Sequence, residues 1–219
     1  MKAWSGRRLA RNAVVATVGL VALAGLILAA LLRGSLPILD GEVQLVGLTA
    51  NVTVDRDANG VPTVRGTDRL DVARATGFLH GQERFFQMDL MRRRAAGELS
   101  ELIGAATLSV DRDARVHRFR AVATEVVARF EEREKALTEA YVDGVNEGLD
   151  ALRVRPYEYL LLGARPSPWQ SEDSVLCVLA MYLTLHESHG EREATLAIMR
   201  DALPPALFAF LAPRGTLDW

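Results

Sequence analysis

An uncharged run from Ala13 to Leu32 separates a short basic segment from the rest of the chain. As a helix rising about 1.5 Å per residue, this run is long enough to cross a hydrocarbon core of about 30 Å. Arg7, Arg8 and Arg11 precede it, so the positive-inside tendency keeps them in the cytoplasm and sends the following chain outward. The pattern predicts a cytoplasmic flank and transmembrane signal anchor over residues 1–33. Residues 34–219 then form an extracytoplasmic region that faces the periplasm or the cell exterior.

A cleaved secretory signal peptide is the alternative interpretation of the same run. Apolar regions of signal peptides are usually shorter, and no small-x-small cleavage pattern follows, because Ala29-Ala30 is succeeded by Leu31-Leu32-Arg33. These features favour an uncleaved anchor.

The first part of the exported region has the pattern of a β-hairpin. Between Glu42 and Arg65, β-branched residues flank the turn-forming sequence Asp57-Ala58-Asn59-Gly60. The same sequence resembles half of an EF-hand loop, but Gly66 occupies the twelfth position, where a bidentate Glu is required. The pattern therefore predicts a hairpin turn and no calcium loop.

Helical patterns follow the hairpin. Asp68 is a candidate cap for a helix starting near Arg69, and Asp111 for another. The proline-free stretch from Ala121 to Leu152 predicts one long charged helix, and proline-rich sequence then interrupts the helical zone. A further helix is expected from Ser171 to about Tyr182. The fold class predicted is α+β, mostly helical with an amino-terminal β-hairpin.

Polar and aromatic residues alternate in the segment Gly77 to Leu90. Phe78, Phe85 and Phe86 recur at helical spacing, with Gln82 and Asp89 among them. Buried polar groups need hydrogen-bond partners, so the segment predicts a core helix with a satisfied polar network.

The order of residues in this segment is more specific than its pattern. Gly77-Phe78-Leu79-His80-Gly81-Gln82-Glu83-Arg84-Phe85-Phe86-Gln87-Met88-Asp89-Leu90, continuing to Gly97-Glu98-Leu99-Ser100-Glu101, resembles a segment near the start of the penicillin acylase family of N-terminal nucleophile hydrolases. The resemblance extends over roughly Leu36 to Gly215. It implies the amino-terminal, α-subunit portion of an acylase that hydrolyses carbon–nitrogen bonds in linear amides. The implied fold is a partial αββα fold that lacks the larger chain.

The resemblance also implies which residues serve the active site. In the family, a helix breaks in the region of Met181 to Glu191 to line the acyl pocket. By position, Met181, Thr184 and Leu185 would line that pocket, and Glu191 would be one ligand of a structural calcium ion shared with the larger chain. The family often has Arg or Asn with an aromatic residue at the positions of Thr184 and Leu185, so we expect a wider, more apolar pocket here. A solvent-facing helix residue is the alternative for Glu191.

Other features limit the function classes. Beyond residue 33 the chain carries 21 basic and 28 acidic residues. This region therefore lacks the excess of basic residues that is typical of nucleic-acid-binding proteins. Cys177 is the sole cysteine, in an apolar run typical of a buried, inert thiol. His186-Glu187-Ser188-His189 has one residue too few between its histidines for the zincin motif.

No nucleophile of the family type is visible in the sequence. The resemblance implies a larger catalytic chain, from the same precursor, whose new amino-terminal Ser attacks a small-molecule amide such as a β-lactam side-chain amide or an N-acyl homoserine lactone. Alone, this chain is expected to be catalytically silent and to expose apolar faces meant for that partner. The alternatives are a membrane-anchored helical binding module and an inactive acylase remnant, the second suggested by the altered end Leu217-Asp218-Trp219.

Overall fold

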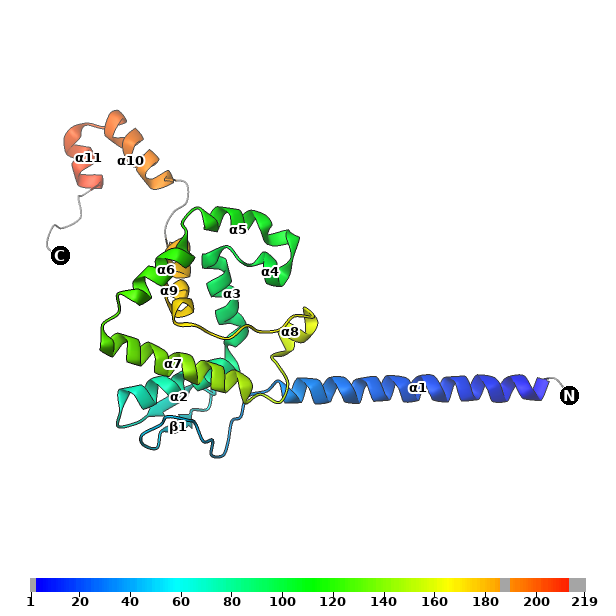
Figure 1. Cartoon of the computed structure of the whole chain (residues 1–219). Helices are drawn as coiled ribbons and strands as arrows, with labels where there is room; N and C mark the ends of the chain where they lie inside the picture. The colour runs from blue at the N-terminus through cyan, green and yellow to red at the C-terminus, as the bar shows by residue number, and fades with distance from the viewer. Residues whose placement is uncertain (1–2, 186–189, 213–219) are drawn as a thin grey trace.

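The computed structural model describes residues 3–185 and 190–212 as a helical body with extensions on two sides (Figure 1). Helix α1 projects from one side, and α10 and α11 stand apart on another. The elements are α1 (Ala3–Gly34), β1 (Thr53–Arg56), β2 (Pro62–Arg65), α2 (Arg69–Glu83), α3 (Phe85–Ala96), α4 (Ser100–Ile103), a 3-10 turn (Ala105–Thr107), α5 (Leu108–Arg115), α6 (Phe119–Ala128), α7 (Glu132–Asp150), α8 (Tyr157–Leu161), α9 (Ser171–Leu185), α10 (Glu191–Ala202) and α11 (Pro205–Leu211).

The predicted hairpin is confirmed. Strands β1 and β2 pair antiparallel, with Thr53 opposite Arg65 and Arg56 opposite Pro62. Asp57 Oδ1 accepts hydrogen bonds from the backbone N–H groups of Asn59 and Val61, each 2.9 Å long. The carboxylate that resembled a calcium ligand therefore stabilises the turn.

Helices α2 and α7 cross with their backbones in direct contact. Asp68 caps α2 as predicted, accepting from the N–H groups of Leu70 and Asp71. Four glycines make the close approach possible, because a methyl group at any of them would overlap a backbone carbonyl oxygen of the facing helix. They are two on α2, Gly77 and Gly81, and two on α7, Gly144 and Gly148.

The segment expected to be one core helix is two. Arg84 leaves the helical conformation with φ −132° and ψ 6°, so α2 ends at Glu83 and α3 starts at Phe85. The predicted polar network is present: Gln82 and Asp89 are buried and hydrogen bonded. Helix α3 then ends at Ala96, and the following residue, Gly97, has a φ of 72°, which suits a residue without a side chain.

Two expectations for the middle of the chain were wrong. Asp111 does not cap a helix that follows it, because it lies inside α5, and its carboxylate accepts from the N–H groups of Leu99 and Ser100 at the start of α4. The long helix from Ala121 to Leu152 is divided into α6 and α7. A reciprocal capping box between Glu131 and Glu134 starts α7 and makes the division.

Helix α1 is joined directly to the body at its carboxyl end. The N–H of Val154 donates to the carbonyl oxygen of Gly34 over 3.0 Å, and the hydroxyl of Ser35 donates to that of Arg155 over 2.8 Å. Within the described residues, Arg11–Gly34 is the one helix long and apolar enough to cross a membrane, and a signal sequence would satisfy the same test. The division of the chain into an anchor over residues 1–33 and an extracytoplasmic region over residues 34–219 stays a prediction.

Candidate functional site

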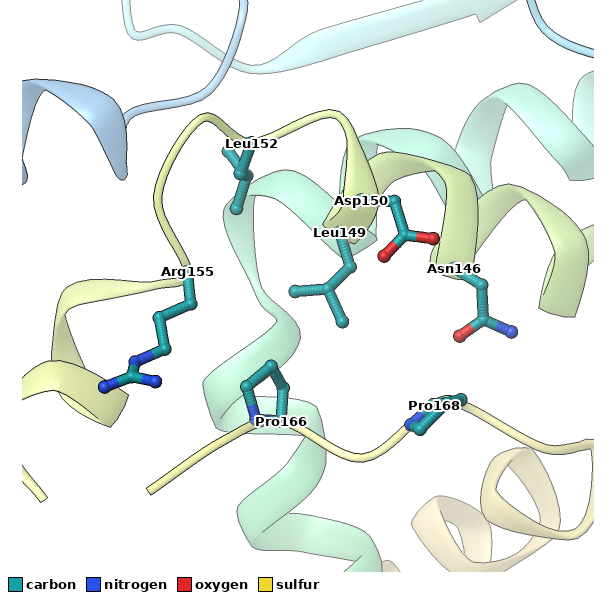
Figure 2. Close-up of a pocket in the computed structure, with 7 residues that line it drawn as sticks. All are labelled: Asn146, Leu149, Asp150, Leu152, Arg155, Pro166 and Pro168. Atoms are coloured by element: carbon teal, nitrogen blue, oxygen red, sulfur yellow. The ribbon is translucent and has the colours of Figure 1, made fainter. Parts of the chain in front are cut away.

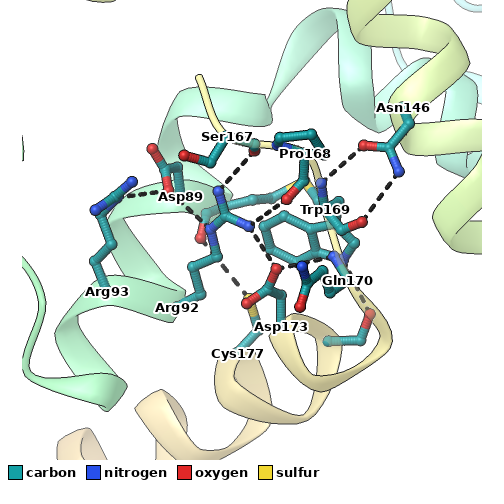
Figure 3. Close-up of polar contacts among 12 residues, drawn as sticks. Asp89, Arg92, Arg93, Asn146, Ser167, Pro168, Trp169, Gln170, Asp173 and Cys177 are labelled. Atoms are coloured by element: carbon teal, nitrogen blue, oxygen red, sulfur yellow. Dashed lines mark hydrogen bonds and ion pairs between the residues drawn. The ribbon is translucent and has the colours of Figure 1, made fainter. Parts of the chain in front are cut away.

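A buried arginine joins α9 to the rest of the body (Figure 3). The guanidinium of Arg92, on α3, donates to the carboxylate of Asp173 on α9. It also donates to the carbonyl oxygens of Ser167 and Pro168, over 2.9 and 3.1 Å, in the segment that leads into α9. The side chain of Arg92 is only 5% exposed. This planar group therefore fixes both the start of α9 and its approach segment.

Asp89 is the negative centre beside this arginine. Its Oδ1 accepts 2.8 Å hydrogen bonds from Nε of Arg92 and Nε of Arg93, and its Oδ2 accepts a 2.6 Å bond from the hydroxyl of Tyr159. Asp89 and Tyr159 are completely buried. Burial, followed by the bond to Asp89, raises the pKa of Tyr159 well above its ordinary value. Tyr159 is thus held as a neutral donor, and the cluster has a positioning role.

Asp173 completes the network on the α9 side. It accepts from the N–H of Gln170 over 2.9 Å and from Nη1 of Arg120 over 2.9 Å, in addition to its bond with Arg92. Trp169 lies against the guanidinium of Arg92, whose carbon is 4.9 Å from the ring centroid. Sequence reasoning did not single out these residues. The one available signal was the dense run of charges from Asp89 to Arg94 in an aromatic segment.

One face of α9 is buried and another is exposed. Leu176 and Ala180 pack with α3 and α6 residues in a single hydrophobic cluster. Val178, Met181 and Leu185 recur at helical spacing and are 64%, 53% and 75% exposed. The network around Arg92 therefore holds α9 so that an apolar stripe remains open.

The sequence-predicted pocket residues occupy the last two turns of this helix. Met181, Thr184 and Leu185 are exposed, and the hydroxyl of Thr184 donates to the carbonyl oxygen of Ala180 over 3.1 Å. α9 extends three residues beyond the expected end near Tyr182. The interval between α9 and α10 contains the His186–His189 motif, which lies outside the described residues.

Glu191 is the first residue of α10 and is exposed. Calcium is bound by six to eight oxygen ligands, so one carboxylate cannot form its site. No group of three or more His, Cys, Asp or Glu side chains suited to a metal occurs within residues 3–185 and 190–212. Glu191 is a suitable hard ligand, but the described part of the chain does not complete a calcium site around it.

Two cavities open elsewhere on the body. Asn146, Leu149, Asp150, Leu152, Arg155, Pro166 and Pro168 line one of about 260 Å³, where the side chain of Leu149 lies between Asp150 and Arg155 (Figure 2). Asn146 is not available there, because its amide exchanges two hydrogen bonds with the backbone of Trp169. A second cavity, of about 310 Å³, lies where α1 joins the body. Met181, Thr184, Leu185 and Glu191 line neither cavity.

Cys177 has the environment of an inert thiol. Its Sγ lies 3.9 Å from the carbonyl oxygen of Met88, and the side chain packs beside a hydrophobic cluster. Burial, with a smaller contribution from Asp173, raises the pKa of Cys177 to about 11. The raised pKa agrees with the inert thiol expected from the sequence, although Cys177 is half-buried and not fully buried.

We expect Cys177 to alkylate slowly, with a rate that continues to rise with pH. With a pKa of about 11, roughly one thiol in a thousand is ionised at pH 8, and the thiolate is the reactive form. The rate with iodoacetamide, followed by intact mass, should increase about tenfold from pH 8 to pH 9. Unfolding the chain in urea is the control and should restore the fast reaction of an ordinary cysteine. A rate that levels off near pH 9 in the folded protein would contradict the raised pKa.

Comparisons with known proteins identify relatives of the chain. The sequence profile of the family described as Penicillin amidase matches residues 51–216. The chain is 38% identical over 144 residues to "Penicillin acylase 2 proenzyme" of Pseudomonas sp. (strain SE83). This alignment covers 66% of this chain and 19% of the relative. It is 34% identical over 168 residues to "Acyl-homoserine lactone acylase QuiP" of Pseudomonas putida (strain KT2440), covering 75% of this chain and 21% of the relative. The chain thus spans about a fifth of the length of these relatives.

A solved structure has the same fold. The structure described as a thermostable penicillin G acylase from Alcaligenes faecalis superposes with a TM-score of 0.57 at 24% sequence identity, covering 76% of this chain and 94% of that chain. The mostly helical arrangement with one small hairpin is therefore similar to that of a penicillin G acylase of known structure. Together with the profile match over most of the sequence, it shows that the chain is an α-subunit-sized member of the penicillin amidase family.

Proposed function

We propose that this chain is the α-subunit-like part of an amide hydrolase, and that it supplies acyl-pocket residues to a larger, nucleophile-bearing chain. The observation that carries the proposal is the family match, which includes the segment from Met181 to Glu191. The relatives named above are a penicillin acylase and an acyl-homoserine lactone acylase, so the substrate class proposed here is a small linear amide. The exposed stripe Val178, Met181 and Leu185 supports the need for a partner surface.

Each chain has a separate chemical role in this proposal. Hydrolysis of an amide needs an activated nucleophile and donors for the oxyanion, and the larger chain would provide both, starting with its amino-terminal Ser. Met181, Thr184 and Leu185 would contact the acyl group of the substrate. Because the Thr184 hydroxyl is already bonded within α9, the surface these residues offer is mainly apolar. Glu191 would contribute one oxygen ligand to a structural calcium ion, with the remaining ligands from the larger chain.

The proposal also places the body outside the cytoplasm. Arg11–Gly34 serves as an uncleaved anchor, and its carboxyl end is bonded to the body at Val154 and Arg155. The alternative of a binding module without a catalytic partner has one observation in its favour, the same exposed stripe on α9. A surface of that kind would serve either purpose.

Purification from native membranes distinguishes the two functions. We expect a larger chain with an amino-terminal Ser to copurify, as seen by intact mass, and the complex to hydrolyse a linear amide, whereas the purified 219-residue chain should not. Calcium bound by that complex should fall in Glu191→Gln but not in Glu193→Gln, which alters an exposed carboxylate two residues along the same helix. Recovery of the 219-residue chain alone would favour the binding module or an inactive remnant. Turnover by that chain alone would also contradict the proposal.

A further inference from the structure

Two buried side-chain nitrogens have no hydrogen-bond partner within the described part of the chain, Nε2 of Gln82 and Nε of Arg155. Both residues are bonded to the segment that follows α1. Ile38 N donates to Oε1 of Gln82 over 2.9 Å, and Ser35 Oγ donates to the carbonyl oxygen of Arg155 over 2.8 Å. Buried polar groups in proteins are nearly always hydrogen bonded. Arg155 lines the cavity of about 260 Å³, whereas Gln82 lines the one of about 310 Å³ where α1 joins the body, so the unpaired donor of this second cavity is Gln82.

Gln82 is the more restricted of the two. It is 5% exposed, and the bond from Ile38 fixes which end of its amide is the oxygen. Its Nε2 must then be a donor. Gln82 lines the cavity of about 310 Å³, whose walls come from the segment after α1, the α2–α3 junction and the start of α8. A volume near 300 Å³ is at the lower end for small-molecule sites.

The cavity lining carries charges of both signs. Arg84 is exposed and has no ion-pair partner among the described residues. Glu158 provides a carboxylate, whereas the carboxylate of Glu83 is already paired with Arg56. Phe86 and Tyr157 add aromatic walls. A free amide donor, a cation and an anion beside aromatic walls are complementary to a zwitterionic phosphate ester.

We propose that this cavity binds the headgroup of a zwitterionic aminoalkyl phospholipid. The inference rests on the proposed anchoring of α1, which would place Ser35 and the cavity at the membrane surface. The phosphate accepts hydrogen bonds from Nε2 of Gln82 and from Arg84, and the ammonium group lies by Glu158. The acyl chains follow the exposed apolar surface of α1, where Leu31 and Leu32 are 37% and 43% exposed.

The test uses the full chain in lipid nanodiscs that contain phosphatidylethanolamine and phosphatidylglycerol in equal amounts. After release into detergent, native mass spectrometry should show one phosphatidylethanolamine retained per chain. Gln82→Glu keeps the acceptor for Ile38 but removes the donor, and should reduce retention at least tenfold. Gln44→Glu, the same change at an exposed glutamine outside the cavity, should retain lipid like the parent. Free phosphoethanolamine should not displace the lipid, because it lacks the acyl chains.

Two further variants keep the test decisive if Gln82→Glu does not fold. Arg84→Ala, at an exposed position, should lower retention of phosphatidylethanolamine, and Glu158→Gln should remove the preference for phosphatidylethanolamine over phosphatidylglycerol. Retention that is equal in all variants would overturn the site, as would a membrane-bound chain that retains no lipid. A chain that does not insert into the nanodiscs would overturn both the site and the proposed anchor.

Discussion

Gly148→Ala should destabilise the protein by about 3 kcal/mol or more, the upper range for overpacking a core. In a helix, alanine is favoured over glycine by about 1 kcal/mol, so helix propensity alone predicts that Gly148→Ala stabilises the protein. Here the added methyl group would overlap the carbonyl oxygen of Phe78, which belongs to the rigid backbone of α2. Since the helix cannot accommodate this by a side-chain rotation, the steric cost exceeds the gain in propensity. Urea unfolding in mild detergent, followed by far-ultraviolet circular dichroism, measures the effect.

Glu139→Ala is the matched control for this prediction. Glu139 is exposed on the same helix, α7, so its replacement should change the free energy of unfolding by less than about 0.5 kcal/mol. Similar losses are expected at Gly77, Gly81 and Gly144, which face backbone oxygens in the same way. Normal stability of Gly148→Ala would mean that α2 and α7 lie further apart than described above.

Asp89→Asn should cost about 3–5 kcal/mol of stability, the range for removing one partner of a buried ion pair. The substitution preserves size but removes the charge between Arg92 and Arg93, whose side chains are 5% and 10% exposed. Arg92 keeps Asp173. Arg93 keeps only Glu101, whose side chain is 61% exposed, so Arg93 loses its buried counterion. The free energy of unfolding in urea, with circular dichroism as readout, gives the loss.

Two comparison variants separate burial from the mere presence of an ion pair. Asp201→Asn removes the partner of Arg200 in a pair whose side chains are 64% and 72% exposed, and should cost less than about 1 kcal/mol. Tyr159→Phe removes one hydrogen bond to Asp89 and should cost about 1.5–3 kcal/mol. Equal effects of Asp89→Asn and Asp201→Asn would mean that Asp89 is not a buried counterion of Arg92 and Arg93.

Sequence patterns predicted the elements whose boundaries are encoded locally. The hairpin follows from the turn at Asp57, and the start of α2 follows from the carboxylate of Asp68. The division before Glu132 could not be predicted in this way, because neither proline nor glycine marks it. The carboxylate of Asp111 was misjudged for a different reason: it caps a helix that precedes it in the chain, a tertiary contact without a local signal.

The candidate site was only partly accessible to sequence reasoning. Similarity to the family selected Met181, Thr184, Leu185 and Glu191, and their roles stay proposals. The residues that hold α9 in place, Arg92 and Asp173, are 81 positions apart, so no periodic pattern relates them. No prediction was made from the glycine pairs, although their spacing is visible in the sequence. Gly77 and Gly81, like Gly144 and Gly148, are four residues apart, which places each pair on one helix face.

The crossing of α2 and α7 also sets the order in which the chain can mature during synthesis. The ribosome adds about 5–20 residues per second, so the glycine face of α2 has no packing partner for several seconds, until α7 has been synthesised. The hydrogen bond from the N–H of Val154 to the carbonyl oxygen of Gly34 can form only after that. A nascent chain therefore carries an unpaired helix face while residues 84–150 are added, and a chaperone would be of most use in that interval.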